Sequence, residues 1–326
     1  MLDLVRVTEA AALRAARLMG KGDPDAVFQA ASDGMRGMLE LVDISGHVVL
    51  GAAERDREPG LLTGLFSGDR VGRGRKGEVD VAVYPVEGTR LVARGLPNAM
   101  SIFTAAQKGS LATPSLQYLD KIAVGPKAVG RIDITRPVAE NLRAVAAALR
   151  RKVRDLTVVI LDRPRHAELI ERVRETGARI KLISDGDVSA GVATALEDSG
   201  VDMLLGMGGA REGVLTAAAL RCLGGEIQAR PWFPDDGARM AAMTRGVEVE
   251  RVYRAEDLAH GDSIIFSATG VTDGDLLRGV RYRGEKALTH SVVMRARTRT
   301  VRFIEAQHDL RVKTIRSQSK RREEMV

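Results

Sequence analysis

A glutamate, a glycine and a threonine follow an apolar run of the sequence, and their types suit divalent-cation chemistry. The run, residues 79–86, alternates valine with other residues and contains Pro85, so we expect a buried strand that ends at the proline and leads into a tight turn. Glu87 could then ligate a cation, and the hydroxyl of Thr89 could orient a water molecule. A second acid three residues before Glu87 would let two carboxylates converge on one ion, but Tyr84 stands there. The pattern therefore indicates a cation site with one anionic ligand missing.

Four further segments place phosphate-binding residue types where a predicted strand ends. These segments are 161–166, 183–187, 205–213 and 266–270. In the first, Arg163 and Arg165 flank a proline, and guanidinium groups match the geometry of phosphate oxygens. In the second, Asp185, Gly186 and Asp187 could accept sugar hydroxyls or hold a cation. The third is a glycine-rich turn that opens a helix, so its backbone N–H groups could hold an anion.

Each of these segments also has a plainer interpretation. The glycine-rich segment could be only a tight turn, the aspartates a solvated turn, and the arginines a surface salt-bridge cluster. Because the carboxyl ends of parallel strands meet at one edge of a sheet, the four together favour a shared site for an anionic ligand.

The histidines and the single cysteine show no spacing that suits catalysis or metal binding. We expect all five histidines to be structural, and only one of them, His166, lies beside a candidate site; the five are His47, His166, His260, His290 and His308. Cys222 lies in an apolar segment and is expected to be a buried packing residue. The glycine-rich turn lacks the Lys-Ser/Thr of a P-loop and the spacing of a dinucleotide-binding fingerprint.

The elements that must position these groups change in character near residue 134. Before it, short strands dominate, including expected strands at 91–94 and 99–103, which indicates an antiparallel or mixed sheet. From residue 138 to 223, helices and strands alternate, which is typical of a parallel sheet. We therefore predict an N-terminal α+β half, 1–134, with the metal-site region, and a C-terminal α/β half, 135–326, with the anion-binding loops. Residues 313–326 form a basic tail.

Composition restricts the class of protein and its partners. With 326 residues, 44% hydrophobic and 29% charged, the chain is typical of a soluble globular protein. A net charge of +7 suits nucleic acid or a small anion, but scattered basic residues and 3% aromatics favour a phosphate-bearing metabolite. One cysteine excludes an internal disulfide and suits a reducing cytosol. No signal peptide or membrane-length apolar run is present, so we predict a cytoplasmic protein without a membrane or nucleic-acid partner.

At these motifs the sequence resembles the class II fructose-1,6-bisphosphatases, the GlpX family, over nearly its whole length, from Arg6 to about Asp309. The segments that carry the resemblance are 118–126, 161–166, 185–188, 208–214 and 266–270. The resemblance implies the layered αβαβα sugar-phosphatase fold of the inositol monophosphatases and a homodimer or homotetramer. It also implies hydrolysis of the 1-phosphate of fructose 1,6-bisphosphate with Mg²⁺ or Mn²⁺, a phosphoric monoester hydrolase reaction.

The same resemblance assigns sugar-phosphate contacts to residues that match the family pattern. They are Glu87, Gly88, Thr89, Tyr118, Arg163, Arg165, Asp185, Gly186, Asp187 and Gly209. It also implies that Glu87 and Glu212 hold the cation, that Thr89 positions water, and that these three residues are the catalytic ones.

Three of the five acids that the resemblance implies as metal ligands are replaced, by Phe28, Ala52 and Tyr84. Loss of three carboxylates leaves too little negative charge and too few oxygens for a two-metal site. One weakly held ion at Glu87 and Glu212, completed by substrate phosphate, stays open. Compensation by neighbouring acids also stays open; these are Asp25, Asp33, Glu54 and Asp56.

Three hypotheses follow. The chain is an active sugar bisphosphatase with an altered metal site, or a pseudophosphatase that senses a sugar phosphate or pairs with an active paralogue. In the third hypothesis the rebuilt site runs metal-independent chemistry with Tyr84 as an acid/base group.

Overall fold

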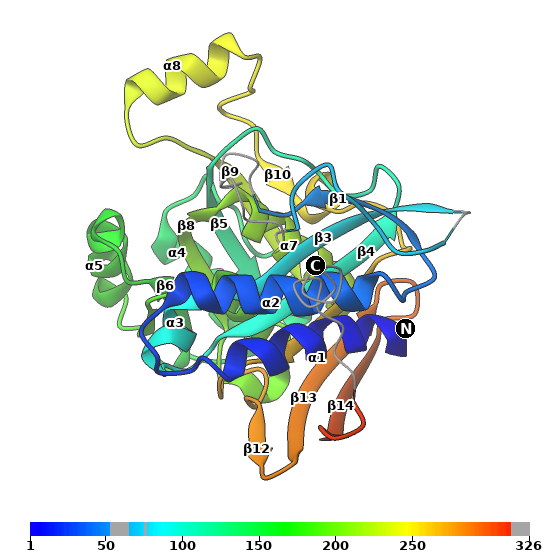
Figure 1. The fold of residues 1–326 in the computed structure, drawn as a ribbon. Coiled ribbons are helices and arrows are strands. Elements are labelled where there is room, and N and C mark those ends of the chain that lie inside the picture. The colour runs from blue at the N-terminus through cyan, green and yellow to red at the C-terminus, as the bar shows by residue number, and fades with distance from the viewer. Residues whose placement is uncertain (53–64, 75–76, 314–326) are drawn as a thin grey trace. The chain divides into compact units, whose positions relative to one another are not determined.

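A computed structural model of the chain describes residues 1–52, 65–74 and 77–313 (Figure 1). It divides into two compact units: unit one is Met1–Leu111 with Ser263–Val326, and unit two is Ala112–Asp262. The units therefore change at residues 111–112 and 262–263. The functional division that we placed at residues 134 and 135 stays a prediction. Most of the basic tail, residues 314–326, lies outside the described residues.

Unit one is built on a mixed sheet of eight strands among the described residues. In sheet order they are β12 (Arg281–Arg283), β13 (Lys286–Arg295), β11 (Ile265–Gly270), β4 (Met100–Gln107), β3 (Glu78–Glu87), β1 (Ser45–Leu50) and β2 (Arg70–Val71), with β14 (Thr300–Asp309) paired to β13. Among these described strands, only β1 and β3 run parallel. The helices α1 (Leu2–Ala16) and α2 (Pro24–Leu39) lie side by side over this sheet (Figure 1). The mixed sheet expected for this part of the chain is confirmed.

Two local predictions for unit one were wrong. Strand β3 does not end at Pro85 but continues to Glu87, because a bulge between Tyr84 and Glu87 accommodates a residue that cannot donate to the sheet. The expected strand at 91–94 is instead the helix α3 (Thr89–Arg94). Glycines in the left-handed conformation stand at both of its ends, a common way to stop a helix, and its Leu-Val-Ala segment is buried within one short turn.

Unit two contains a second mixed sheet. Its strands in order are β10 (Tyr253–Arg254), β9 (Glu226–Trp232), β5 (Tyr118–Val124), β8 (Met203–Gly209), β6 (Thr157–Leu161) and β7 (Arg179–Ile183). The alternating segment gives the parallel strands β7, β6 and β8, as predicted. The sheet as a whole is mixed. The strand β5 precedes the alternating segment and inserts antiparallel between β8 and β9, and β10 returns antiparallel at the edge.

Helices cover both faces of this second sheet. They are α4 (Val138–Leu149), α5 (Ala167–Glu175), α6 (Asp187–Ala193), α7 (Ala210–Leu223) and α9 (Ala255–Leu258), with single 3₁₀ turns at Pro126–Ala128, Val153–Asp155, Pro164–His166 and Glu197–Ser199. The helix α8 (Asp236–Thr244) instead extends away from this sheet (Figure 1). On the α4–α5 face, Ile122, Val158 and Leu205 join helix residues in one buried cluster. The other face carries α7, which contacts Leu119 through Gly213 and also contains the buried Cys222.

Two mixed sheets with packed helices confirm the α/β class expected from the sequence. None of the described helices is both long enough and apolar enough to span a membrane.

Candidate functional site

The predicted anion-binding residues of unit two meet at one edge of its sheet. Arg163 and Arg165 follow the end of β6, and Gly209 ends β8. Tyr118 begins β5 directly opposite Gly209, so the antiparallel strand enters the sheet at the edge where the parallel strands end. Asp185, Gly186 and Asp187 follow β7 at the same edge, and Glu212 lies in the first turn of α7. The residues predicted in the first three segments thus lie at one sheet edge. The fourth segment, 266–270, is part of the strand β11 in the sheet of unit one, so the expectation that all four segments share one sheet edge was wrong.

A buried ion pair organises this edge. The side chain of Lys121 is fully buried and forms an ion pair with Asp187, the first residue of α6. Its Nζ also donates to the carbonyl of Gly209 at 3.2 Å. An unpaired charge in such a position would be costly, so each partner depends on the other. Sequence reasoning missed Lys121, although strand alternation places it between the buried Leu119 and Ala123 on the α7 face, where a lysine is exceptional.

The glycines of the turn before α7 are required by close packing. A Cβ atom on Gly208 would lie 2.1 Å from Oδ2 of Asp187 and 2.7 Å from Nζ of Lys121. A Cβ atom on Gly209 would lie 1.8 Å from Oε2 of Glu212, whose carboxylate folds back over the start of its own helix. The glycines therefore admit the carboxylates of both neighbouring helices to the same small space.

The two arginines are held by backbone carbonyls and not by acids. Arg163 donates from Nη1 to the carbonyl of Asp162 at 3.0 Å and from Nη2 to that of Ser184 at 2.6 Å. Arg165 donates to the carbonyl of Met207 at 2.9 Å, and its guanidinium lies over the ring of Tyr118. Among the described residues neither arginine has a carboxylate partner in an ion pair, and Nε of Arg165 is buried without a hydrogen bond. Both cations are positioned yet still able to bind an anion.

His166 fixes the loop that carries these arginines. Its side chain is fully buried, with Nδ1 2.7 Å from the carbonyl of Leu161 and Nε2 accepting the N–H of Met207 at 2.7 Å. This pattern requires a neutral ring with the proton on Nδ1, and burial lowers the pKa of His166. Gly206, at φ 117°, admits the ring, because a Cβ there would lie 2.8 Å from Nε2. The structural role that we predicted for this histidine agrees with these contacts.

Asp185 is the acid at this edge whose ionised form is disfavoured. Burial raises the pKa of Asp185. The N–H of Gly186, which donates to Oδ1 at 3.0 Å, and the charge of Arg163 lower it, whereas Glu212 and Asp187 raise it further. A ligand hydroxyl that donates to Asp185 would stabilise the carboxylate.

The predicted residues of unit one lie where β3 passes into α3. Glu87 is almost fully buried, with 1% of its surface exposed. Gly88 has φ 83°, a conformation that favours glycine, and Thr89 begins α3. Tyr84 lies on the other side of the bulge and is half-buried. The backbone therefore presents one acid where the resemblance implies two.

The other positions implied as metal ligands carry no acid. Phe28 lies half-buried in α2, and Ala52 forms a bridge with Phe66. Asp33, a possible substitute, is buried and pairs with Arg14 at 2.8 Å. Glu54 and Asp56 lie outside the described residues.

The described residues do not fit a resident divalent-metal site. No three side chains of histidine, cysteine, aspartate or glutamate among them are grouped so that they could hold a metal ion. Cations of this class require several oxygen ligands. The acids at the sheet edge of unit two instead lie beside positively charged side chains of the protein, as Asp187 lies beside Lys121.

Comparison with known proteins gives the family. Residues 1–308 match the family described as bacterial fructose-1,6-bisphosphatase, glpX-encoded. The chain is 40% identical, over 94% of both chains, to a D-fructose 1,6-bisphosphatase class 2/sedoheptulose 1,7-bisphosphatase of Synechococcus sp. (strain JA-2-3B'a(2-13)). It is 41% identical, over 95% of both chains, to fructose-1,6-bisphosphatase 1 class 2 of Escherichia coli (strain K12). With a match of this length and two relatives of this similarity, the chain belongs to the glpX-encoded family of class II fructose-1,6-bisphosphatases.

Proposed function

We propose that this protein binds a sugar bisphosphate, with one phosphate held at the sheet edge of unit two. The observation that carries the proposal is the pair of guanidinium groups of Arg163 and Arg165, which are fixed by backbone carbonyls and lack carboxylate partners among the described residues. Guanidinium groups in this state bind phosphate oxygens through strong, directional hydrogen bonds.

The remaining contacts of unit two suit the sugar itself. Hydroxyl groups of a sugar would stabilise the carboxylate of Asp185, whose pKa is raised by burial. The ring of Tyr118 offers a flat apolar surface beside Arg165. The names of the two relatives specify fructose 1,6-bisphosphate and sedoheptulose 1,7-bisphosphate as their substrates. We propose fructose 1,6-bisphosphate as the ligand to test first.

For hydrolysis, we propose that turnover is slow because the carboxylates for a metal are missing. Glu87, Thr89 and Glu212 are the residues proposed to act on the 1-phosphate, with Glu87 and Glu212 the only proposed ligands for Mg²⁺ or Mn²⁺. The replacements at Phe28, Ala52 and Tyr84 remove oxygens that such an ion needs. A pseudophosphatase that senses a sugar phosphate or pairs with an active paralogue accounts for the retention of the anion-binding residues.

One experiment tests both parts of this proposal. Phosphate release from fructose 1,6-bisphosphate is measured with excess Mg²⁺ or Mn²⁺, and the melting temperature is measured with the same ligand. We expect a ligand-dependent rise in melting temperature with little phosphate release. Rapid metal-dependent release would refute the pseudophosphatase, and absence of any stabilisation or release would refute sugar-phosphate binding. Release that does not depend on metal would favour the alternative with Tyr84 as an acid/base group.

We also propose a cytoplasmic homodimer or homotetramer. Light scattering of the purified chain tests the assembly.

A further inference from the structure

Trp232, the single tryptophan of the chain, lies beside the predicted sugar-phosphate residues without being one of them. It is the last residue of β9 and stands directly opposite Tyr118, the first residue of β5. The centroids of the two rings are 5.8 Å apart, and the ring planes meet at 85°. This is the edge-to-face arrangement that aromatic pairs prefer. The pair therefore joins the end of β9 to a residue that is predicted to contact the sugar phosphate.

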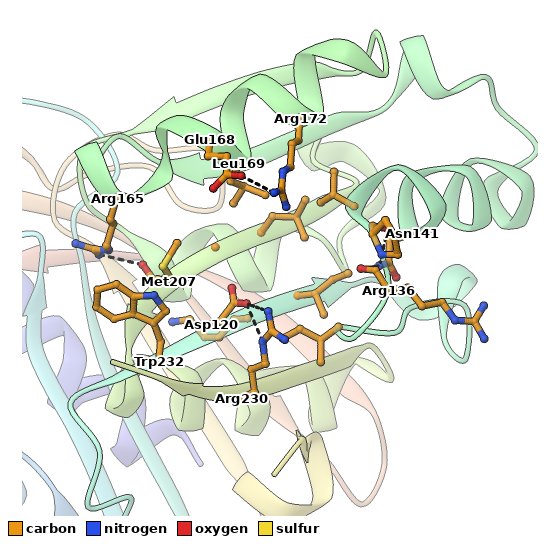
Figure 2. Close-up of a pocket in the computed structure, with 17 residues that line it drawn as sticks. Asp120, Arg136, Asn141, Arg165, Glu168, Leu169, Arg172, Met207, Arg230 and Trp232 are labelled. Carbon is orange, nitrogen blue, oxygen red and sulfur yellow. Dashed lines mark hydrogen bonds and ion pairs between the residues drawn. The ribbon is translucent and has the colours of Figure 1, made fainter. Parts of the chain in front are cut away.

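Tyr118 in turn contacts Arg165. The guanidinium carbon of Arg165 lies 5.5 Å from the centroid of the Tyr118 ring, within the distance at which a cation is attracted to an aromatic face. Figure 2 shows Trp232 and Arg165 at the same end of a pocket that both residues line, with the bond from Arg165 to Met207 dashed. The contacts thus run from Trp232 through Tyr118 to Arg165.

The two arginines of the sheet edge differ in how their orientation is fixed. Arg163 donates to two backbone carbonyls, at 3.0 and 2.6 Å. Arg165 donates to one, that of Met207, and among the described residues its buried Nε has no hydrogen bond. A single hydrogen bond leaves a planar guanidinium free to turn about that bond, so the ring of Tyr118 is the second contact that limits its orientation. Orientation matters because a guanidinium fork matches phosphate oxygens only in its own plane.

The ring of Tyr118 has few other restraints among the described residues. Its hydroxyl accepts a hydrogen bond from Nε2 of Gln117 at 3.4 Å, which is long for such a bond. Tyr118 and Trp232 are both half-buried, so the core does not enclose the tyrosine ring on all sides. The edge-to-face contact with Trp232 is therefore the one that most restricts how the Tyr118 ring turns.

We propose that Trp232 is a positioning residue of the sugar-phosphate site. It acts behind the ligand contacts: it holds the ring of Tyr118, and that ring sets the plane of the Arg165 guanidinium for a phosphate group. The inference rests on the proposed function and adds to it a residue outside the predicted contacts. A smaller side chain without a ring at position 232 would let Tyr118 and Arg165 adopt more orientations, so binding would have to order them first.

Calorimetry with fructose 1,6-bisphosphate, without added metal, tests this role. Trp232→Leu is expected to raise the dissociation constant about fivefold, the order of one aromatic pair, and Trp232→Phe to restore most of the affinity. The control is Tyr253→Leu. Tyr253 lies in the edge strand β10 of the same sheet and also has a guanidinium, that of Arg251, 4.8 Å from its ring centroid. It is not a predicted contact, and its loss should leave the affinity unchanged.

Double variants separate positioning of Arg165 from general support of the fold. Added to Arg165→Gln, Trp232→Leu should weaken binding no further, because the group that it positions is gone. Added to Arg163→Gln, it should still raise the dissociation constant about fivefold. Should Trp232→Leu not fold, Trp232→Met takes its place, since it also lacks a ring but is longer.

The outcomes distinguish this inference from the proposed function. If the wild type binds fructose 1,6-bisphosphate and Trp232→Leu binds it equally well, the inference is overturned and the proposed function stands. An equal loss of affinity in the Arg163→Gln and Arg165→Gln backgrounds also overturns the inference, since Trp232 would then support the sheet edge as a whole. If the wild type does not bind the ligand, the proposed function fails, and the inference fails with it.

Discussion

The sheet edge of unit two and the β3–α3 turn of unit one differ in which charges they retain. At the sheet edge, Arg163 and Arg165 are held by backbone carbonyls, and a buried Lys121–Asp187 pair supports the turn beside them. At the β3–α3 turn, Glu87 is kept, but Tyr84 occupies the position of a second acid. The first region carries arginines that lack carboxylate partners in ion pairs among the described residues, and the second carries one acid where the proposed cation site would need two.

This difference shows that binding a phosphate and hydrolysing it make separate physical demands. Phosphate binding needs fixed cations and donors, which we propose that the loops after β6 and β7 supply without a metal. Hydrolysis in this class of site needs carboxylates that gather ions. Gly208 and Gly209 resist substitution because carboxylate oxygens fill the space of a side chain.

The largest effect is expected in unit two, where Lys121→Met tests whether the buried Lys121–Asp187 pair stabilises the sheet edge. Removal of the buried cation leaves Asp187 uncompensated, so we expect a loss of about 3–5 kcal/mol in the free energy of unfolding. Urea denaturation measures it. The control is Lys127→Met, because the ion pair of Lys127 with Glu197 is exposed and should contribute about 0–1 kcal/mol. A loss no larger than the control would show that the pair does not support the edge; Asp187→Asn added to Lys121→Met should recover part of it.

The unit-one side is tested by restoring the missing acids together. The triple change Phe28→Asp, Ala52→Glu, Tyr84→Asp should raise metal-dependent release of phosphate from fructose 1,6-bisphosphate by about 100-fold, the order expected for a few kcal/mol of metal stabilisation. Release is measured with and without Mn²⁺. A folded triple variant that binds the sugar phosphate but shows no gain would mean that these positions are not the missing ligands.

Much of the fold of unit two could be predicted from the sequence alone. Alternating strands and helices predicted β6, α5, β7 and β8, because short apolar strands and an amphipathic helix follow one another along this segment. The loops after those strands were therefore placed correctly at one edge. The site roles of these residues stay predictions, since the family shows the reaction class and not the contacts of this chain.

The errors have local physical causes. The helix α3 is six residues long, too short for a periodic signal, and its limits depend on the left-handed Gly88 and Gly95. Strand β3 continues past Pro85 because, at the bulge, the sheet does not require a backbone N–H from that residue. The position of β5 between β8 and β9 depends on long-range pairing, which no local pattern reports. Strand alternation could have singled out Lys121, but no local pattern reports its partner Asp187, which lies 66 residues away.

A smaller effect sharpens the functional assignment of the sheet edge. Arg163→Gln removes one charged donor, so the dissociation constant of fructose 1,6-bisphosphate should rise about tenfold. Calorimetry measures it. Arg174→Gln is the control, because that arginine pairs with Glu171 on an exposed helix surface away from the edge. Equal affinities in both variants would exclude Arg163 as a phosphate contact.

The smallest expected effect is a difference in acid sensitivity caused by His166. Burial lowers the pKa of His166, the hydrogen bond to Leu161 opposes this, and the charge of Arg165 adds to the lowering. As the pH falls, the unfolded chain therefore binds a proton at His166 at a higher pH than the folded chain does. The stability that the neutral ring contributes is complete above about pH 6.5, the ordinary value for histidine, and is lost as the pH falls below it.

Melting temperatures of the wild type and of His166→Gln between pH 8 and pH 5 test this. The variant should have the flatter profile, although His308 and His290 in unit one, whose pKa values burial also lowers, leave part of the slope in place. Parallel profiles would mean that the ring can accept a proton without losing the N–H of Met207. The loop that carries both arginines would then be held by other contacts.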